Sequence, residues 1–392
     1  MKPRILAGLL FSCLIINAAP AAGGFKHPGI LNSKQELEFV KARIAAAEQP
    51  WTDALAKMRA LSMASLDYQA KPHEEVNCGS GSKPDYGCTD EKRDCQAAYL
   101  QALLWAVTGD EKHAQKSAEI LKAWSILKSH GLSNANLEAG WTGGPFLRAA
   151  EILKYTDSKW TQEDQKAFAE MIKRAFLPNV EKPQRSSTNG NWEAVMIETA
   201  MSIAVFTDDR KLFDSAVARY KRLLPAYVYG KEDGDVPKVI DAAYFDAREK
   251  IDKHWYGQTV LFDGLCQETG RDFTHSQWGI GGLIHCAEIA WHQGVDLYSV
   301  DDNRLLRGME FHAKYLNGAP VPPELQGGKL KGADKVCPMW EIAYNHYHGR
   351  KKLAMPETEK LLAKNRPEVG PDHHLGFGTL SHYGTAGADR SP

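Results

Sequence analysis

The chain of 392 residues is 43% hydrophobic and 25% charged, close to the average for globular proteins, which excludes a wholly disordered, collagen-like or polytopic membrane protein. Its 48 Lys and Arg and 49 Asp and Glu give a formal net charge of −1, which disfavours a nucleic-acid-binding protein of the basic-patch type. By length alone the chain has room for two or three domains.

The N-terminus has the three parts of a secretory signal peptide. A basic start, Met1–Arg4, is followed by an apolar run, Ile5–Ile16, and by the small residues of Ala19–Ala21. The run is shorter than the ~20 residues that span a bilayer, so we expect a cleaved signal rather than a membrane span. The sequence therefore predicts a signal peptide over residues 1–22 and a periplasmic or extracellular protein over residues 23–392.

Export would place the cysteines in an oxidising compartment, where an even number permits pairing. Cys13 lies in the predicted signal, and the apolar run that continues past it disfavours a lipoprotein anchor. The remaining cysteines are Cys78, Cys88, Cys95, Cys266, Cys286 and Cys337. We expect a disulfide between two of the first three, and buried thiols in helices at Cys266 and Cys286. The sequence lacks the usual spacing of Cys and His metal ligands, so neither a metal nor a cofactor is predicted.

Hydrophobic patterns with the period of a helix recur from end to end, and convincing β-alternation is absent from the sequence. The predicted helices are Lys34–Ala47, Trp51–Ala64, Asp94–Val107, Glu111–Ser129, Trp141–Tyr155, Thr161–Ala175, Trp192–Phe206, Arg210–Ala226, Tyr256–Thr269, His275–His292, Asp302–Leu316 and Trp340–Arg350. Short joins suggest stacked αα-hairpins, so we predict an all-α protein whose one domain, residues 23–392, forms an α/α toroid. A linear solenoid is the alternative, but the sequence lacks the fixed repeat length of solenoids.

The first polar cluster lies at a junction between a loop and a helix, residues 187–193. Asn-Gly is a turn dipeptide, and Asn191 is a natural N-cap for the helix that follows. The same amides also suit a site for a carboxylate, because they donate hydrogen bonds without adding a competing acid. Asn189 and Asn191 are therefore candidate binding residues.

The second polar cluster joins two of the predicted helices. Thr274 and, three residues later, Gln277 form a capping-box pattern, so a new helix should begin near His275. Arg271 and Asp272 then lie in the turn, and His275 lies in the first turn of the helix. An Arg, an acid and a His within one short turn suggest a site that handles anions.

Two further segments are rich in polar aromatic side chains. The predicted helix near the C-terminus carries Tyr344, His346 and Tyr347, some of which must belong to the core while others would line a sugar groove. Just before the second polar cluster, His254 and Tyr256 add another His and Tyr.

Three of these segments resemble the alginate-lyase-like family of polysaccharide lyases. They are Asn189–Glu193 (NGNWE) followed by an apolar helix, Gly270–Asp272 (GRD) with His275, and Glu341–Tyr347 (EIAYNHY). The resemblance covers roughly Trp141 to Arg350, over half of the mature chain. It implies an incomplete α/α toroid that cleaves a uronic-acid polysaccharide by β-elimination, with this polyanion and no nucleic acid as its partner. An oligomeric state is not predicted.

Elimination removes the C5 proton of a uronate and breaks the C4–O4 bond. The C5 proton is acidic only when donors such as Asn and Arg neutralise the adjacent carboxylate. A base takes this proton and an acid protonates the departing O4, each contributing about 10²–10⁴ in rate. His275 is the first choice for the base, because it is nearest to Arg271 in the sequence. Tyr256 and Tyr347 are next, as base or acid; a Tyr base, with a pKa of about 10, needs a cation such as Arg271 to lower it.

The resemblance also assigns roles residue by residue. Asn191 matches the amide that neutralises the carboxylate, with Asn189 as a second candidate, and Arg271 matches the arginine beside the base. The residues expected to contact the substrate are Asn189, Trp192, Gln277, His254, Tyr344 and His346.

The chain departs from the best-known alginate lyases in two places. They have an Asn-His pair where this chain has Asn191 and Trp192, and a Tyr after the Arg where this chain has Gln277 and Trp278. These differences weaken the case for alginate itself as the substrate, and a glucuronan or another uronate-containing glycan fits as well.

Two other classes of protein remain open. A glycoside hydrolase would use two carboxylates, for which Asp272 with Glu193 or Glu341 is the candidate pair. A binding protein would hold polyuronide chains without cleaving them.

Overall fold

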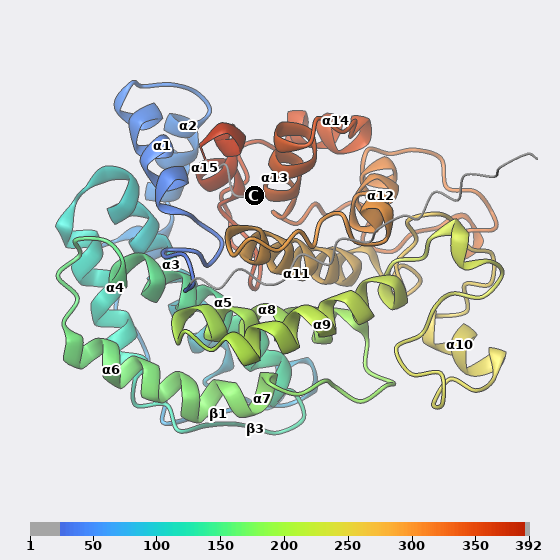
Figure 1. Ribbon diagram of the computed structural model, residues 1–392, viewed down its shortest axis with the longest axis horizontal. Coiled ribbons are helices and arrows are strands. Elements are labelled where there is room, and N and C mark those ends of the chain that lie inside the picture. The colour runs from blue at the N-terminus through green and yellow to red at the C-terminus, as the bar shows by residue number, and fades with distance from the viewer. Residues whose placement is uncertain (1–23, 389–392) are drawn as a thin grey trace, which may run out of the picture.

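The computed structural model describes residues 24–388, so the predicted signal peptide lies outside the described part. Helices dominate this part of the chain, and every helix expected from the sequence except Tyr256–Thr269 overlaps a helix of the structure. Figure 1 shows these helices paired in layers that curve around one another.

The inner layer consists of helices that pack on one another in chain order. They are α3 (Cys88–Thr108), α5 (Ala135–Lys154), α8 (Gly190–Phe206), α11 (Phe273–His292) and α13 (Trp340–Tyr344). Helix α8 shows why they lie inside, because every residue from Ala194 to Phe206 is buried. A helix that is apolar on nearly all sides is stable only when other elements surround it.

The outer helices cover the inner ones and have one apolar face. They are α4 (Glu111–Trp124), α6 (Gln162–Met171), α7 (Leu177–Val180), α9 (Arg210–Tyr227), α12 (Val300–Leu316) and α14 (Pro356–Asn365). Helix α4 packs on α3, α9 packs on α8, and α12 packs on α11. A π-helical turn, Ile172–Phe176, joins α6 to α7. These pairs are the αα-hairpins that the sequence predicted.

The C-terminal part of the chain returns to the N-terminal helices α1 (Lys34–Ala45) and α2 (Trp51–Arg59). The short helix α15 (Gly378–His382) contacts both of them, and α1 packs on α3. Arg350 ends a π-helical turn after α13 and forms ion pairs with Glu36 of α1 and Glu288 of α11, each at 2.7 Å. The hairpins therefore form an incomplete α/α toroid, as expected.

Glycines bring α5 and α8 unusually close together. A Cβ atom on Gly140 would lie 2.8 Å from Val195 Cγ2, and one on Gly143 would lie 2.5 Å from Thr199 Cγ2. Real side chains do not tolerate such distances, so the close contact of these two helices requires glycine on α5.

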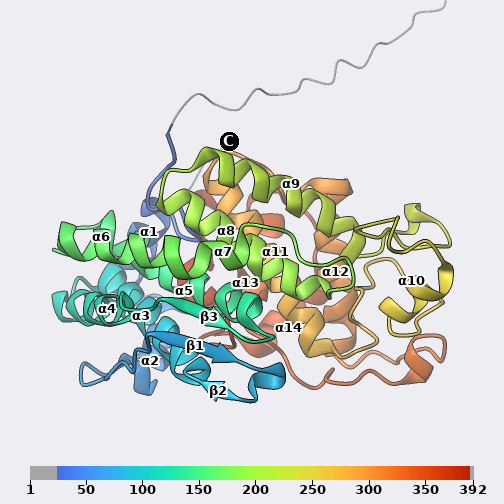
Figure 2. The ribbon, with the colours of Figure 1, turned by 90° about the horizontal axis from the view of Figure 1, so that it is seen from below.

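A small sheet that the sequence did not predict lies beside α3 and α5, as Figure 2 shows. Strand β1 (Glu75–Cys78) pairs antiparallel with β2 (Asp85–Tyr86) and parallel with β3 (Ser129–Gly131). These strands are too short to produce a recognisable alternation of polar and apolar residues.

A disulfide joins Cys78, at the end of β1, to Cys88, the first residue of α3. The bond confirms the expected pairing within the N-terminal group of cysteines. Cys266 and Cys286 are buried free thiols, as predicted, although Cys266 lies in an irregular segment rather than in a helix.

The predicted helix Tyr256–Thr269 is wrong. The short helix α10 (Arg248–His254) ends just before it, and Tyr256 and Gly257 both adopt left-handed conformations, with φ of 55° and 77°. Consecutive left-handed residues end a helix. The side chain of Gln258 then binds the backbone of a later loop, donating to Glu324 O and accepting from Gln326 N, both at 3.0 Å.

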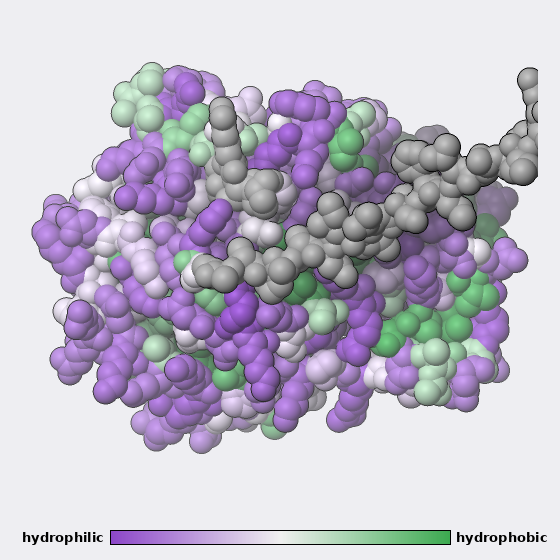
Figure 3. Space-filling view, in the orientation of Figure 1, coloured by the Kyte–Doolittle hydropathy of each residue, from purple (hydrophilic) through white to green (hydrophobic). Residues whose placement is uncertain are grey.

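The face seen in Figure 3 is largely hydrophilic, with small hydrophobic patches that include one on the right, over the segment around α10. That segment has three exposed hydrophobic side chains, Val236, Tyr244 and Val260. Among the described helices, none combines the length and the apolar character needed to cross a membrane.

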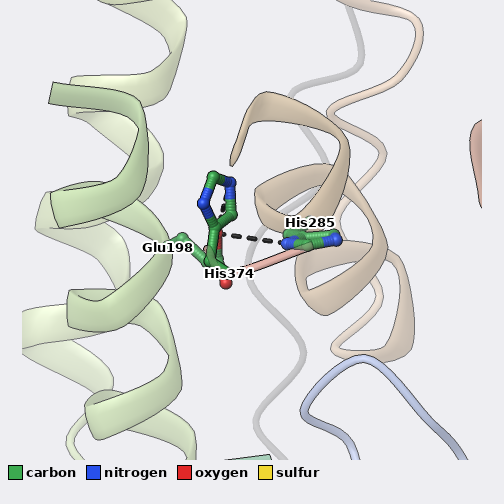
Figure 4. Close-up of side chains that lie close together, drawn as sticks. All are labelled: Glu198, His285 and His374. Carbon is green, nitrogen blue, oxygen red and sulfur yellow. Dashed lines mark ion pairs between the residues drawn. The ribbon is translucent and has the colours of Figure 1, made fainter. Parts of the chain in front are cut away.

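A buried polar group joins three inner helices to the C-terminal segment (Figure 4). The carboxylate of Glu198 on α8 lies 3.2 Å from His285 Nδ1 on α11 and 3.8 Å from His374 Nε2. Arg148 of α5 donates to this carboxylate, to His285 Nδ1 at 2.8 Å and to the backbone oxygen of His374 at 2.9 Å.

The two imidazoles of this group are neutral at pH 7. Burial lowers the pKa of His374 to about 3 and also lowers the pKa of His285, and Arg148 strengthens both effects. A carboxylate with two imidazoles resembles a metal site, but the guanidinium of Arg148 already supplies positive charge at Glu198. We therefore interpret the group as a structural anchor for the C-terminal segment.

Candidate active site

The first two turns of four neighbouring inner helices carry polar and aromatic side chains that lie together. Lys92 comes from α3, Trp141 from α5, Trp192 from α8 and Trp278 from α11. Lys92 Nζ lies 4.9 Å from the centre of the Trp141 ring, which is 5.9 Å from that of Trp278. This end of the toroid is the candidate active site.

Glu268 is the buried centre of one half of this site. Its Oε1 accepts from Arg271 Nη1 at 2.9 Å, and its Oε2 accepts from the backbone N of Asn191 at 3.1 Å and from the Tyr227 hydroxyl at 3.2 Å. Burial raises the pKa of Glu268, while Arg271 opposes that effect. This carboxylate therefore ties the first turn of α8 to the turn that carries Arg271.

Asn189 and Tyr256 are brought together beside Glu268. Asn189 Nδ2 donates to the Tyr256 hydroxyl at 2.8 Å, and Asn189 Oδ1 accepts from Gln267 Nε2 at 3.1 Å. Burial raises the pKa of Tyr256 and Glu268 adds to the rise, although Arg271 acts in the opposite direction. The phenol thus stays protonated at pH 7, which suits an acid better than a base.

The structure corrects the predicted first residues of two helices. Helix α8 begins at Gly190, so Asn191 lies in its first turn and is not the N-cap. Helix α11 begins at Phe273, and its cap is Asp272, whose Oδ1 accepts from the backbone N of His275 at 2.9 Å. The capping box expected at Thr274 is wrong because the aspartate two residues earlier takes that role.

Asp272 also orients the side chain of His275. Both carboxylate oxygens lie 2.8 Å from His275 Nδ1. Burial would raise the pKa of Asp272, but the hydrogen bonds from His275 outweigh it and hold this pKa below its usual value. The imidazole therefore faces an ionised carboxylate, while 23% of the His275 side chain stays exposed.

Aromatic rings form the wall of the site. Trp192 and Trp278 pack against a small buried cluster that contains Trp141. The ring centre of Trp278 lies 4.7 Å from that of His275 and 4.1 Å from that of His373. Aromatic faces with polar edges suit the stacking of sugar rings.

Two hollows lie on either side of the segment that carries Asp372. One, of about 250 Å³, is lined by Lys92, Arg93 and His373 together with Asp372. The other, of about 500 Å³, is lined by Lys335 and also by Asp372. The linings of these hollows include four basic side chains, Lys57, Lys92, Arg93 and Lys335.

Two residues expected in the site are instead part of the core. Tyr347 is fully buried, and its hydroxyl donates to Tyr298 O at 2.8 Å. His346 is also buried and stacks on Tyr298 with 3.8 Å between ring centres, and burial lowers its pKa to about 3. Both side chains are enclosed by the core, so the predicted catalytic Tyr347 and substrate-binding His346 are not brought to the candidate active site.

Tyr344 lies in a different place. It stacks on His348 with 4.8 Å between ring centres and lines a separate cavity of about 900 Å³ with Arg366. This cavity is larger than the two hollows beside Asp372, but its lining lacks Lys92, Lys335 and His373, the residues of those hollows that contact Trp141 and Trp278. These contacts place the smaller hollows, and not the larger cavity, beside the candidate site.

Gln277 and His254, which the sequence predicted to contact the substrate, form hydrogen bonds within the fold instead. Gln277 is buried, donates to Lys335 O and accepts from Cys337 N, both at 2.9 Å, so it holds the loop before α13. The backbone oxygen of His254 accepts from Gln267 at 2.5 Å, and burial lowers the pKa of its ring to about 4.

The carboxylates considered for hydrolysis are already engaged. Glu193 accepts from Arg219 at 2.8 Å and Glu341 from Arg366 at 2.7 Å, and both glutamates are buried. Neither is paired with Asp272. The arrangement therefore does not favour the two-carboxylate alternative.

Sequence reasoning missed four members of the site: Glu268, Lys92, Trp141 and His373. Only Glu268 had a local signal, because it lies three residues before Arg271, the spacing of neighbours on a helical turn. The other three come from segments far away in the sequence, and only the fold brings them together.

Comparisons with known proteins agree with this fold. The family model described as alginate lyase matches residues 80–321. Alginate lyase A1-III from Sphingomonas species A1 is 15% identical, with 91% of this chain and 99% of that chain covered and a TM-score of 0.62. A variant of A1-III complexed with tetrasaccharide is 14% identical, with 91% of this chain and 98% of that chain covered and a TM-score of 0.62. An alginate lyase from Bacteroides ovatus is 13% identical, with 91% of this chain and 99% of that chain covered and a TM-score of 0.57. No curated protein matches the sequence.

Proposed function

The chain belongs to the alginate lyase family and is a polysaccharide lyase, and we propose that it is secreted and cleaves a uronic-acid polysaccharide, alginate or glucuronan, by β-elimination. The observation that supports this best is the convergence of Asn191, Arg271 and His275 around the buried Glu268. They are the amide, the cation and the imidazole that elimination from a uronate requires.

Asn191 and Arg271 would neutralise the carboxylate of the substrate. The side-chain oxygen of Asn191 is buried without a hydrogen-bond partner among residues 24–388, and Arg271 keeps 32% of its side chain exposed beside Glu268. Donors that are already fixed in place stabilise the enolate-like transition state without reorganisation. Asn189 would assist through the neighbouring Tyr256.

His275 and Tyr256 would transfer protons. His275 is oriented by Asp272, and Tyr256 is a protonated phenol close to Arg271 and Asn189. Trp192 and Trp278 would stack against the sugar rings, and Lys92 and Lys335 would meet further carboxylates along the chain.

Two observations support secretion. The first residues read as a signal peptide, and Cys78 and Cys88 form a disulfide, a bond typical of oxidising compartments. A polysaccharide too large to cross a membrane would also encounter the protein only in the periplasm or outside the cell.

The test is incubation of the purified chain with alginate, glucuronan and hyaluronan, followed by ultraviolet absorbance and product size. Elimination produces a C4–C5 double bond conjugated to the carboxylate, so absorbance should rise as the chains shorten. The Arg271→Ala variant, purified identically, controls for contaminating lyase. Shorter products without absorbance would show a hydrolase, and binding without shortening would show a binding protein; either result contradicts the proposal.

A further inference from the structure

The C-terminal segment brings a second histidine to the candidate active site. His373 precedes His374, whose backbone oxygen is held by the buried Arg148. The ring centre of His373 lies 4.1 Å from that of Trp278 and 4.5 Å from that of Trp141. Since His275 also contacts Trp278, two segments that are distant in the sequence each place an imidazole against the same indole.

The two histidines are held in the same way. His373 Nδ1 lies 2.7 Å from Asp372 Oδ1, just as His275 Nδ1 lies 2.8 Å from the oxygens of Asp272. A carboxylate at Nδ1 fixes the orientation of the ring and leaves Nε2 for proton exchange. Neither Nε2 has a hydrogen-bond partner among residues 24–388. Two oriented imidazoles at one stacking surface match the two proton transfers of an elimination.

The charges around the two rings differ. Asp372 is shared between His373 and Lys335, whose Nζ lies 2.8 Å from it. Burial lowers the pKa of His373, and Lys92 and Lys335 lower it further against the opposing effect of Asp372. His373 is therefore a neutral imidazole at pH 7, with a lone pair at Nε2.

The carboxylate beside His275 has a different set of neighbours. Asp272 faces His275 with both oxygens, and no lysine or arginine within residues 24–388 forms an ion pair with Asp272. The site thus contains two imidazoles that are each oriented by a carboxylate, and His373, which has Lys92 and Lys335 nearby, is the one suited to accept a proton.

Building on the proposed function, we infer that His373 is the base of the elimination and His275 is its acid. His373 Nε2 takes the C5 proton, and the electron pair of the C5–H bond becomes the C4–C5 double bond. The C4–O4 bond breaks with its electrons on O4, which takes the proton from His275 Nε2. Solvent then removes a proton from His373 and returns one to His275. This assignment reverses the role that proximity to Arg271 had suggested for His275. It also replaces Tyr256 as the acid and leaves the Tyr256 hydroxyl as a hydrogen-bond donor to the substrate.

The experiment is the pH dependence of kcat/KM, on a polyuronide that the wild type cleaves, for His373→Gln and His275→Gln. Each variant should lose about 10²–10⁴ in kcat/KM, the usual contribution of one proton-transfer group. His373→Gln should also lose the decline on the acidic side, because a base must be deprotonated, and His275→Gln should lose the decline on the basic side. His348→Gln, an exposed histidine outside the site, is the matched control and should behave as wild type.

Three readouts separate a catalytic His373 from a structural one. Circular dichroism should show that His373→Gln stays folded at the assay temperature, and added imidazole should restore part of the activity of His373→Ala. An unchanged pH profile together with no rescue would overturn the assignment, as would wild-type activity in His373→Gln. A wild-type chain that gives no unsaturated product from any polyuronide would overturn the proposed function as well, so the two failures are distinguishable.

Discussion

Arg271 connects the buried and exposed parts of the candidate site. Its Nη1 donates to the fully buried Glu268 at 2.9 Å, while about a third of its side chain, 32%, remains exposed. An arginine held in this way presents a planar set of donors, which fits a carboxylate better than a flexible ammonium group does.

Arg271→Ala and His275→Ala are each expected to lower kcat/KM on a polyuronide by at least about 100-fold, because each removes one charge-handling group from the transition state. The side chain of His275 is partly exposed, so His275→Ala should change the midpoint of thermal unfolding little. Arg271→Ala leaves the buried carboxylate of Glu268 without its cation, so this variant should have a lower midpoint while staying folded at the assay temperature. Formation of unsaturated product measures the first effect and circular dichroism during heating the second.

Arg59→Ala is the matched control for Arg271→Ala, since Arg59 is exposed on α2, outside the site. Turnover close to wild type in either site variant would mean that the reaction takes place elsewhere on the molecule.

At the level of single residues, the sequence predicted those site residues that lie close together along the chain. Asn191, Arg271 and His275 were found because turn and helix-start residues cluster within a few positions. His373 was not assigned a role, because its contact with Trp278 depends on how the C-terminal segment returns across the toroid. Tyr347 was misplaced for the same reason: which side of its helix faces the core is decided by Tyr298, almost fifty residues away along the chain.

At the level of elements, the periodic pattern identified helices correctly where packing on one face holds them. It failed at Tyr256–Thr269, where apolar residues are buried although the backbone is not helical. Trp255 and Leu265 are buried in a second hydrophobic cluster with Phe273, under irregular backbone. Apolar spacing indicates burial, but backbone conformation there is decided by left-handed residues such as Tyr256 and by the contacts of Gln258.

The disulfide gives a test at this level. Replacing both Cys78 and Cys88 with Ala should lower the free energy of unfolding by about 2–4 kcal/mol, because the unfolded chain regains the freedom of the closed loop. Since Cys88 begins α3 and Lys92 lies one turn further, KM for a polyuronide should also rise. Urea unfolding and initial rates measure the two effects.

A reductant provides the control for this double variant. It should destabilise the wild type and leave the variant unchanged, because the other described cysteines are already free thiols. Equal stability of reduced and oxidised wild type would contradict a structural role for the bond.

At the scale of the whole molecule, a buried ion cluster closes the ring of helices. Arg350 contacts Glu36 of α1 and Glu288 of α11 at 2.7 Å, and His292 lies 3.1 Å from Glu36. Burial alone would raise the pKa values of both glutamates, but His292 and Arg350 lower them, that of Glu288 from 4.5 to about 2. The first and last parts of the chain are therefore joined through charges that must stay ionised.

This cluster predicts a specific loss of stability in acid. A carboxylate with a lowered pKa in the folded state contributes stability that is complete above its unfolded pKa and is lost as pH falls towards the folded value. The free energy of unfolding should therefore decrease between pH 4.5 and about 2, as measured by urea unfolding at a series of pH values.

Arg350→Met should lose about 3–5 kcal/mol at pH 7, because two buried carboxylates lose their partner, and its decline in acid should be smaller. Lys351→Met is the matched control, since the neighbouring Lys351 forms only a partly exposed ion pair with Asp296 and should lose about 0–1 kcal/mol. A similar loss in both variants would contradict the role given to the cluster.

The shared start of the inner helices has an electrostatic consequence. Each helix carries roughly half a positive charge at its first turn, through the aligned dipoles of its peptide groups. Lys92, Trp141, Asn191 and His275 all lie within two turns of such a start, so four dipoles point their positive ends at the groove. A molecule with a net charge of −1 thereby offers an anionic chain a local positive potential, one made by backbone rather than by an excess of lysine and arginine.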